Sequence, residues 1–182
     1  MIALTNRSFT PEPGIDPALR AALGKVDQTL IHALVQLKTP PTADHRAKLA
    51  RGGITLRTFL GGTAYLASLS REARLDEMGE ILRWAGPLLP EDKMSRDLWQ
   101  GKIHDWARTS EGKVKVLVEF HEDSETGASK QVLSAYTREF KRHGPSNTWA
   151  VQICESRIRG LAAEEQVRSM EQGPHPMMPL ES

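Results

Sequence analysis

The chain contains a single cysteine, Cys154, in 182 residues. One thiol cannot close a disulfide within the chain, and no cysteine and histidine cluster has the spacing of metal ligands. Cys154 follows a predicted strand and has no histidine or aspartate near it in sequence, so a half-buried structural thiol is a better interpretation than a nucleophile. We expect no metal and no cofactor, and the cysteine count leaves the compartment open.

The chain also lacks an excess of charge of either sign. It carries 24 Lys and Arg against 23 Asp and Glu, a formal net charge of +1 at pH 7. A nucleic-acid surface needs clustered lysine and arginine, so we expect no nucleic-acid partner. No apolar run approaches the roughly 20 residues that span a bilayer. Met1–Pro13 has no apolar segment of a signal peptide, so we expect no membrane partner and a cytoplasmic location by default.

Strand and helix signals alternate in the first half of the chain. Ile31–Lys38 places apolar side chains at every second position, which predicts a strand with one buried face. Thr42 suits the start of a helix and Gly52 its end, and Gly61-Gly62 predicts a hairpin turn. The expected order is strand, helix, strand, strand, helix, strand over residues 31–38, 42–51, 54–60, 63–69, 71–79 and 81–88. This is the ferredoxin-like βαββαβ order.

The second half repeats this pattern at a period of about 83 to 87 residues. Val114–His121 aligns with Ile31–Lys38 without a gap, and apolar positions meet apolar ones. Thr148–Ile153 aligns with Ala64–Leu69 and matches an aromatic residue with an aromatic one. The other expected features are helices over 129–142 and 157–170, a short or irregular strand near 143–147, and a Gly173-Pro174 pair that matches Gly86-Pro87.

The repeat predicts an α+β chain of two tandem ferredoxin-like (βαββαβ) modules, each a four-stranded antiparallel sheet with two helices on one face. Residues 1–28 are expected to be a loose N-terminal leader, residues 29–95 the first module, and residues 113–182 the second module with a C-terminal tail. The linker, residues 96–112, contains two tryptophans that we expect to pack between the modules. A sheet with helices on one face leaves the opposite face free for a partner.

Three segments of the sequence resemble a known family. They are the strand Gly61–Ala67, the ending Trp84–Pro87 and the tail Gly173–Ser182. Together with the surrounding strand and helix pattern, they resemble the N-terminal prodomain modules of subtilisin-like (S8) serine proteases, the inhibitor I9 family. The resemblance covers residues 30–95 and 113–182. It implies a binding protein that inhibits a subtilisin-like serine protease or acts as its folding chaperone, in cis or in trans. The sequence has no motifs of the catalytic domain, so we expect the chain not to be an enzyme.

The resemblance also implies which residues touch the protease. In such prodomains the uncovered sheet face docks on two surface helices of the protease. The residues expected on that face are Lys115, Leu117, Glu119 and Gln152. Glu119 is the candidate to meet a helix N-terminus. The tail is implied to enter the substrate cleft as an added strand through Pro176, Met177, Met178, Pro179, Leu180, Glu181 and Ser182. Its prolines favour an extended conformation, which lowers the entropy lost on binding.

Other functions are compatible with the same pattern. Paired ferredoxin-like modules also serve as small-ligand-binding or sensor proteins, in which a pocket between the modules would hold the ligand. Asp105, His121 and Ser124 could be drawn as a catalytic triad, but three common residue types are weak evidence for one. RNA binding would need exposed aromatic residues on the central strands in a basic setting, which the first strands do not offer.

Overall fold

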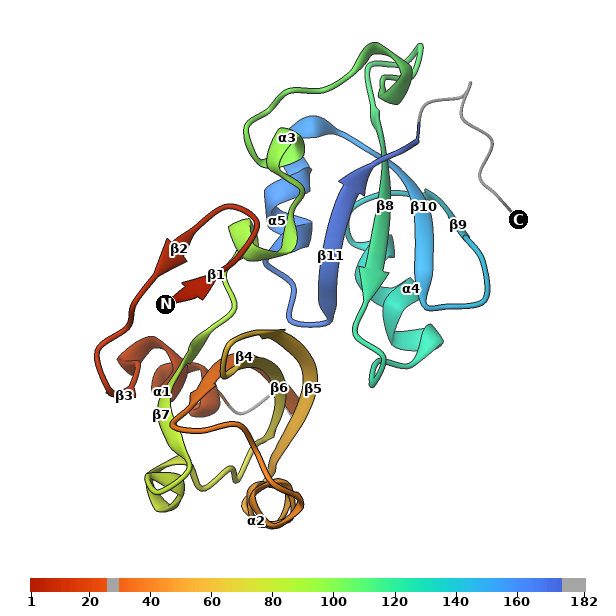
Figure 1. The fold of residues 1–182 in the computed structure, drawn as a ribbon. Helices are drawn as coiled ribbons and strands as arrows, with labels where there is room; N and C mark the ends of the chain where they lie inside the picture. Colours follow the sequence, from red (N-terminus) through yellow and green to blue (C-terminus); the bar gives the residue numbers. More distant parts are fainter. Residues whose placement is uncertain (26–29, 175–182) are drawn as a thin grey trace. The chain divides into compact units, whose positions relative to one another are not determined.

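A computed structural model describes residues 1–25 and 30–174 and shows a mixed α+β protein (Figure 1). The predicted α+β class is therefore confirmed. The chain divides into two units, Met1–Leu88 and Leu89–Ser182, and each has a sheet and a core of its own. Residues 96–112, predicted as a linker, belong to the second unit.

The first unit is built on a five-stranded sheet with the order β3-β7-β4-β6-β5. The strands are β3 (Gly14–Ile15), β4 (Leu30–Leu37), β5 (Ile54–Gly61), β6 (Ala64–Ser70) and β7 (Leu82–Pro87). Neighbouring strands run antiparallel, except that β3 is parallel to β7. The prediction of four strands is wrong for this unit, because the N-terminal segment adds β3 beside β7 at the edge of the sheet.

Local sequence explains where α2 (Ala43–Arg51) and the β5-β6 hairpin form. The Thr42 hydroxyl accepts a hydrogen bond from the His45 backbone N–H at 3.1 Å and so caps the helix. Gly61 and Gly62 have φ values of +104° and +57°, which residues with a side chain rarely adopt. Both the helix start and the glycine turn agree with the sequence predictions.

One face of the first sheet packs on α1 (Pro17–Leu23) and α2. The core between them contains alternate residues of β4 and one leucine from each helix: Ile31, Ala33, Val35, Leu37, Leu19 and Leu49, all at most 4% exposed. The helix predicted over 71–79 is wrong, because only the 3-10 turn η1 (Leu75–Met78) forms there. Its two apolar ends, Leu75 and Met78, are buried in the same core, which fixes this short turn against the sheet.

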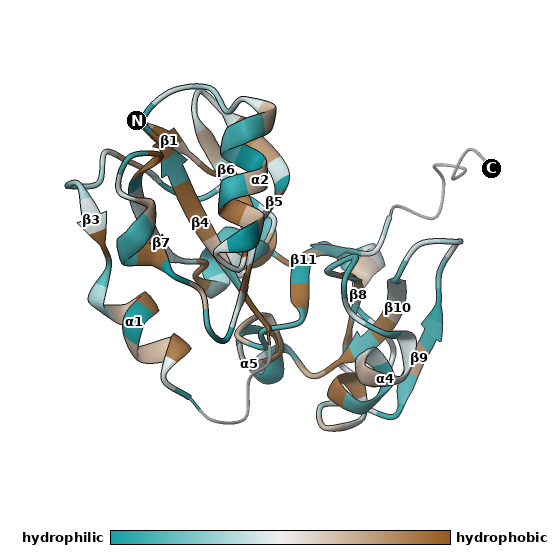
Figure 2. Ribbon diagram, turned by 90° about the horizontal axis from the view of Figure 1, so that it is seen from below, coloured by the Kyte–Doolittle hydropathy of each residue, from teal (hydrophilic) through white to brown (hydrophobic). Residues whose placement is uncertain are grey.

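The other face of the first sheet is covered by a hairpin of β1 (Ile2–Ala3) and β2 (Ser8–Phe9). Ile2 is only 1% exposed. It belongs to an apolar cluster with sheet residues Leu34, Ala64 and Trp84, against which Leu4 and Phe9 also pack. In Figure 2, β4 is brown along most of its length, as expected of a strand buried on both faces.

Further contacts hold the N-terminal segment to the sheet. The rings of Phe9 and Trp84 meet edge to face, with 5.4 Å between their centroids. The Arg83 guanidinium donates to the Pro11 carbonyl at 2.7 Å and to Gln36 Oε1 at 2.8 Å. The sequence predicts a loose leader over residues 1–28. Residues 1–25 differ from that prediction, and residues 26–28 lie outside the described residues. The predicted free face of the first sheet is covered from within the chain.

The second unit has a four-stranded sheet with the order β11-β8-β10-β9, as many strands as predicted, and all neighbours are antiparallel. The strands are β8 (Val114–Phe120), β9 (Glu139–Arg142), β10 (Thr148–Ile153) and β11 (Val167–Gln172). The helices are α3 (Arg96–Trp99), α4 (Thr126–Ser134) and α5 (Ile158–Ala162), and the 3-10 turns are η2 (Pro90–Lys93), η3 (Asp105–Ala107) and η4 (Glu155–Arg157).

Helices α4 and α5 lie on the same side of this sheet (Figure 1). Their buried leucines, Leu133 and Leu161, join one core with the inward side chains of β8, β10 and β11. Trp99 and Trp106, predicted to pack between modules, pack against this core of the second unit. The Arg159 guanidinium lies 4.0 Å from the centroid of the Trp99 ring.

Both helices of the second unit are shorter than the sequence predicts. The predicted helix over 129–142 ends at Ser134, and residues 139–142 form β9 instead. The predicted helix over 157–170 ends at Ala162, and residues 167–172 form β11. Pairing with β10 and β8 outweighs the helix propensity of these polar segments, because it buries Val167 and Met170 and packs the Phe140 ring edge to face on Trp149.

The same pairing register recurs in the two sheets. Val35 of β4 lies opposite Tyr65 of β6, and Val118 of β8 lies opposite Trp149 of β10. These pairs occupy equivalent positions in the sequence alignment of the two halves. The alignment of Gly86-Pro87 with Gly173-Pro174 is wrong by two residues, because Gly86 faces Leu34 whereas Glu171 faces the equivalent Leu117.

Candidate functional site

The outer face of the second sheet carries the alternate side chains of β8 and β10. The inward residues of β8 are buried, whereas Lys115 is exposed and Leu117 is half-buried. Cross-strand pairing places Lys115 beside Gln152 and Leu117 beside Ala150. On the neighbouring strand β9, Glu139 pairs with Gln152 and Lys141 with Ala150. Two rows of side chains therefore cross three strands of this face.

A groove of about 480 Å³ lies on this face. Residues of the second unit line it: Trp106, Lys115, Val116, Leu117, Glu139, Phe140, Lys141, His143, Ala150, Val151, Gln152, Gly173 and Pro174. The groove thus includes three of the four sheet-face residues predicted from sequence, namely Lys115, Leu117 and Gln152. Its volume is within the range of about 300 to 1,000 Å³ that holds ligands or anchoring side chains.

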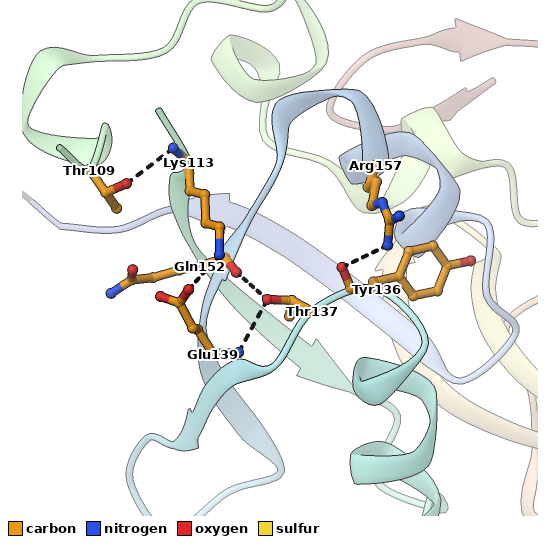
Figure 3. Close-up of polar contacts among 7 residues, drawn as sticks. All are labelled: Thr109, Lys113, Tyr136, Thr137, Glu139, Gln152 and Arg157. Atoms are coloured by element: carbon orange, nitrogen blue, oxygen red, sulfur yellow. Dashed lines mark hydrogen bonds and ion pairs between the residues drawn. The ribbon is translucent and has the colours of Figure 1, made fainter. Parts of the chain in front are cut away.

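An ion pair borders the groove at the edge strand. The Lys113 ammonium contacts the Glu139 carboxylate (Figure 3). The hydrogen bond to Glu139 is the main cause that raises the pKa of Lys113. The Lys113 backbone N–H also donates to the Thr109 hydroxyl at 3.1 Å, which orients the start of β8. The negative charge of Glu139 is therefore already matched from within the unit.

A threonine hydroxyl joins the ends of β9 and β10 beside this ion pair. Thr137 Oγ1 donates to the Gln152 carbonyl at 2.6 Å and accepts from the Glu139 backbone N–H at 3.2 Å (Figure 3). Just before it, the Tyr136 carbonyl accepts from Arg157 at 3.2 Å. These contacts end the α4 segment, fix the beginning of β9 and hold Glu139 and Gln152 in adjacent positions.

Trp106 lines the groove from η3, in the segment that precedes β8. The His104 ring stacks on the Trp106 indole with 4.3 Å between centroids and 7° between planes. Gln172 of β11 holds this segment, because its amide oxygen accepts from the His104 N–H and its amide nitrogen donates to the Lys102 carbonyl, both at 2.8 Å. The Gly173 N–H then donates to the Lys115 carbonyl at 2.8 Å.

Glu119, the fourth predicted residue of the face, is paired within the unit. Arg168 of β11 donates to its Oε1 at 3.1 Å. Glu119 is half-buried and does not line the groove. The predicted tail residues Pro176, Met177, Met178, Pro179, Leu180, Glu181 and Ser182 lie outside the described residues.

Sequence reasoning missed several groove residues. The sequence predicts a helix over 129–142, which hides the place of Lys141 on the edge strand β9 and of His143 just after it. The sequence predicts Trp106 as an apolar residue of the linker, but its approach to the sheet depends on the hydrogen bonds that Gln172 makes with Lys102 and His104. A strand predicted over residues 139–142 would have been the signal for these groove residues, because it places Lys141 on the same sheet face as Lys115.

The described residues also bear on a reactive thiol, a metal site and a membrane span. Cys154 is free and exposed, so the prediction of a half-buried thiol is wrong. Within residues 1–25 and 30–174, no group of three or more His, Cys, Asp or Glu side chains is placed to hold a metal ion. No helix in that part of the chain combines the length and apolar character needed to cross a membrane.

One comparison with known proteins gives a match. A family model described as "Domain of unknown function (DUF8729)" matches residues 3–89. The matched segment nearly coincides with the first unit, Met1–Leu88, and begins at Ala3, within the N-terminal hairpin. No curated protein and no solved structure matches the chain significantly.

Proposed function

We propose that this chain is a non-enzymatic binding protein whose second unit docks its open sheet face on a subtilisin-like serine protease. Bound in this way, it acts as an inhibitor of the protease, as its folding chaperone, or as both. The observation that carries the proposal is the groove on the second sheet, because its lining ends at Gly173 and Pro174, where the tail begins. The resemblance to I9 prodomains supports the choice of partner.

The proposed fold for both units is ferredoxin-like. In each unit the four core strands, numbered 1 to 4 along the chain, lie in the spatial order 4-1-3-2. These strands are β4, β5, β6 and β7 in the first unit and β8, β9, β10 and β11 in the second. The shared register of Val35 with Tyr65 and of Val118 with Trp149 supports a duplication of one ancestral module. On this view β3 and the β1-β2 hairpin are additions to the first copy.

The two units have different roles in this proposal. The hairpin covers the outer face of the first sheet, where Ile2 packs with Leu34 and Trp84. Leu117 occupies the position equivalent to Leu34 and is half-buried beside the groove. We therefore assign the docking surface to the second unit alone, and the first unit would support it or recognise another feature of the partner.

Docking would gain free energy mainly from apolar burial. Leu117 and Ala150 form the apolar centre of the face, and burying such side chains contributes about 25 cal/mol per Å² before the costs of association. The Lys115 stem can cover apolar surface while its ammonium stays in water. Glu119 would reach a helix N-terminus of the protease only by sharing its carboxylate with Arg168, so we give it a secondary role.

The tail would supply the inhibitory contact. A segment that follows the sheet face can add to the substrate cleft as a strand, with backbone hydrogen bonds for affinity and alternate side chains for selectivity. Attachment to the docked sheet raises the effective concentration of the tail at the cleft. Residues 176–182 are the proposed inhibitory segment, and prolines at 176 and 179 would limit its conformational freedom.

The test is an inhibition assay with purified chain and a panel of subtilisin-like proteases. Full-length chain is compared with a chain ending at Pro174 and with a Leu117→Asp variant. Phe59→Asp is the matched control, because Phe59 is a 60% exposed apolar residue of the first unit. We expect inhibition by the wild type and the control, and at least about tenfold weaker inhibition by the other two. The absence of binding to every protease would refute the proposal.

A further inference from the structure

The groove on the second sheet contains cationic side chains that have no partner in the described part of the chain. Lys115 and Lys141 are exposed, line the groove and make no ion pair or side-chain hydrogen bond there. His143 also lines the groove and its ring makes no polar contact there. Glu139, the acidic lining residue, is paired with Lys113. The groove therefore presents unmatched positive charge.

Apolar groups lie between these cations. Leu117 and Ala150 are cross-strand neighbours, and Lys141 pairs with Ala150 on the next strand. Trp106 adds an aromatic surface from η3, in the segment before β8. Glu171 pairs with Leu117 from β11 but does not line the groove. An occupant that satisfies the site needs an apolar side chain at its centre and carboxylates on either side.

We propose that this groove binds an acidic peptide segment of the partner protein, in which carboxylates flank an apolar side chain. The proposal rests on the docking function above and specifies the chemistry of the partner's surface. Lys115 would meet one carboxylate and Lys141 another, while the apolar side chain contacts Leu117, Ala150 and Trp106. Opposite charges on the groove and on the peptide speed the association of the two proteins and favour this partner over others.

The charge balance of the chain favours a peptide over a nucleic acid as the occupant. The whole chain has a formal net charge of +1 with neutral histidines, and the unpaired cations of the groove are the two lysines Lys115 and Lys141. Nucleic-acid binding sites use many lysine and arginine contacts to phosphates. A local cluster around an apolar centre instead suits a segment with a few carboxylates.

The first test measures peptide binding by the full-length chain. Short capped peptides alternate glutamate with leucine, lysine with leucine, or glutamate with serine, and their affinities are measured by fluorescence anisotropy at low and high salt. The test variant combines Lys115→Glu with Lys141→Glu. The control is Lys130→Glu, because Lys130 is an exposed residue of α4, the helix on the opposite face of the sheet. Circular dichroism checks that both variants fold.

The wild type and the control should bind the glutamate–leucine peptide best, and the double variant at least about tenfold more weakly at low salt. The difference should shrink as salt screens the charges. Equal binding of all three peptides, or binding of none, would overturn the proposal. A chain ending at Pro174 is also compared with the full-length chain. If it binds the peptide at least about tenfold more tightly, the tail is the natural occupant of the groove, and this result would also overturn the proposal.

The protease panel separates this inference from the proposed function. If the double variant inhibits a protease as strongly as the wild type does, the docking function stands and the acidic-segment inference fails. If no protease binds but the glutamate–leucine peptide shows the expected lysine dependence, the groove chemistry stands and the protease assignment fails.

Discussion

Lys93 is a buried lysine whose removal should change how stability depends on pH. It ends η2, is 5% exposed, and its Nζ donates to the Glu164 carbonyl at 2.8 Å. Burial lowers the pKa of Lys93 from 10.5 to about 8, although Glu165, Glu164 and Asp92 act in the opposite direction. The perturbation we consider is Lys93→Met, which keeps the length of the side chain and removes its charge.

The magnitude follows from the difference between the folded and unfolded pKa values. A lysine in the unfolded chain has a pKa near 10.5, whereas Lys93 in the fold has a pKa of about 8. Below pH 8 the folded protein must therefore hold a charged ammonium, which lowers the free energy of unfolding by about 3 kcal/mol compared with a neutral amine at this position. Between pH 8 and pH 10.5 the unfolded state binds more protons, and stability rises with pH. From pH 7 to pH 9 this single group should raise the free energy of unfolding by about 1 kcal/mol.

The assay is urea denaturation of the full-length chain at about pH 7, 8 and 9, with unfolding followed by tryptophan fluorescence. Three of the four tryptophans, including the buried Trp149, lie in the second unit. The exposed Lys130 provides a Lys130→Met control. We expect the free energy of unfolding of the wild type and of the control to rise by about 1 kcal/mol from pH 7 to pH 9. Lys93→Met should not show this rise. The same pH dependence in all three proteins would refute the reasoning.

Two further predictions concern the covered sheet and the edge of the groove. Ile2→Ala should destabilise the first unit by about 2 to 4 kcal/mol in urea denaturation, because it leaves a cavity beneath the hairpin. Phe59→Ala, at an apolar residue of the same unit that is 60% exposed, is the control, and equal stability of the two variants would contradict the burial of Ile2. Thr137→Val should lower the free energy of unfolding of the second unit by about 1 to 3 kcal/mol, because the Gln152 carbonyl loses its donor. Ser134→Ala on the exposed end of α4 should change it by less than about 0.5 kcal/mol, and a similar effect of both changes would remove the role given to Thr137.

Strand alternation made part of the fold predictable. β4, β8 and β10 have buried faces with period-two apolar patterns, and Thr42 and Gly61-Gly62 mark local starts and turns. β9 and β11 were not predictable, because their polar sequences favour a helix and become strands only by pairing with distant neighbours. The N-terminal hairpin also escaped prediction, since its strands have two residues each and its burial depends on Trp84.

The candidate site was predictable to a similar degree. The alternation of apolar and polar residues along β8 predicts that Lys115 and Leu117 lie on the outer face, as they do in the structure. The groove itself depends on a loop held by Gln172 and on the edge strand that carries Lys141, and both arise from tertiary contacts. The partner of Glu119 was equally hidden, because Arg168 reaches it only once β11 pairs with β8.

We propose that, of the two larger sheets in residues 1–25 and 30–174, only the one in the second unit presents an open outer face. The most direct test of this central claim compares the rates of thiol modification of Leu34→Cys and Leu117→Cys, two equivalent positions, in a Cys154→Ser background that removes the exposed native thiol. Leu34 is 1% exposed beneath the hairpin, whereas Leu117 is half-buried at the groove. We predict that the Leu117→Cys variant reacts at least about 100-fold faster under native conditions. Similar rates, or faster reaction of the Leu34→Cys variant, would contradict the claim.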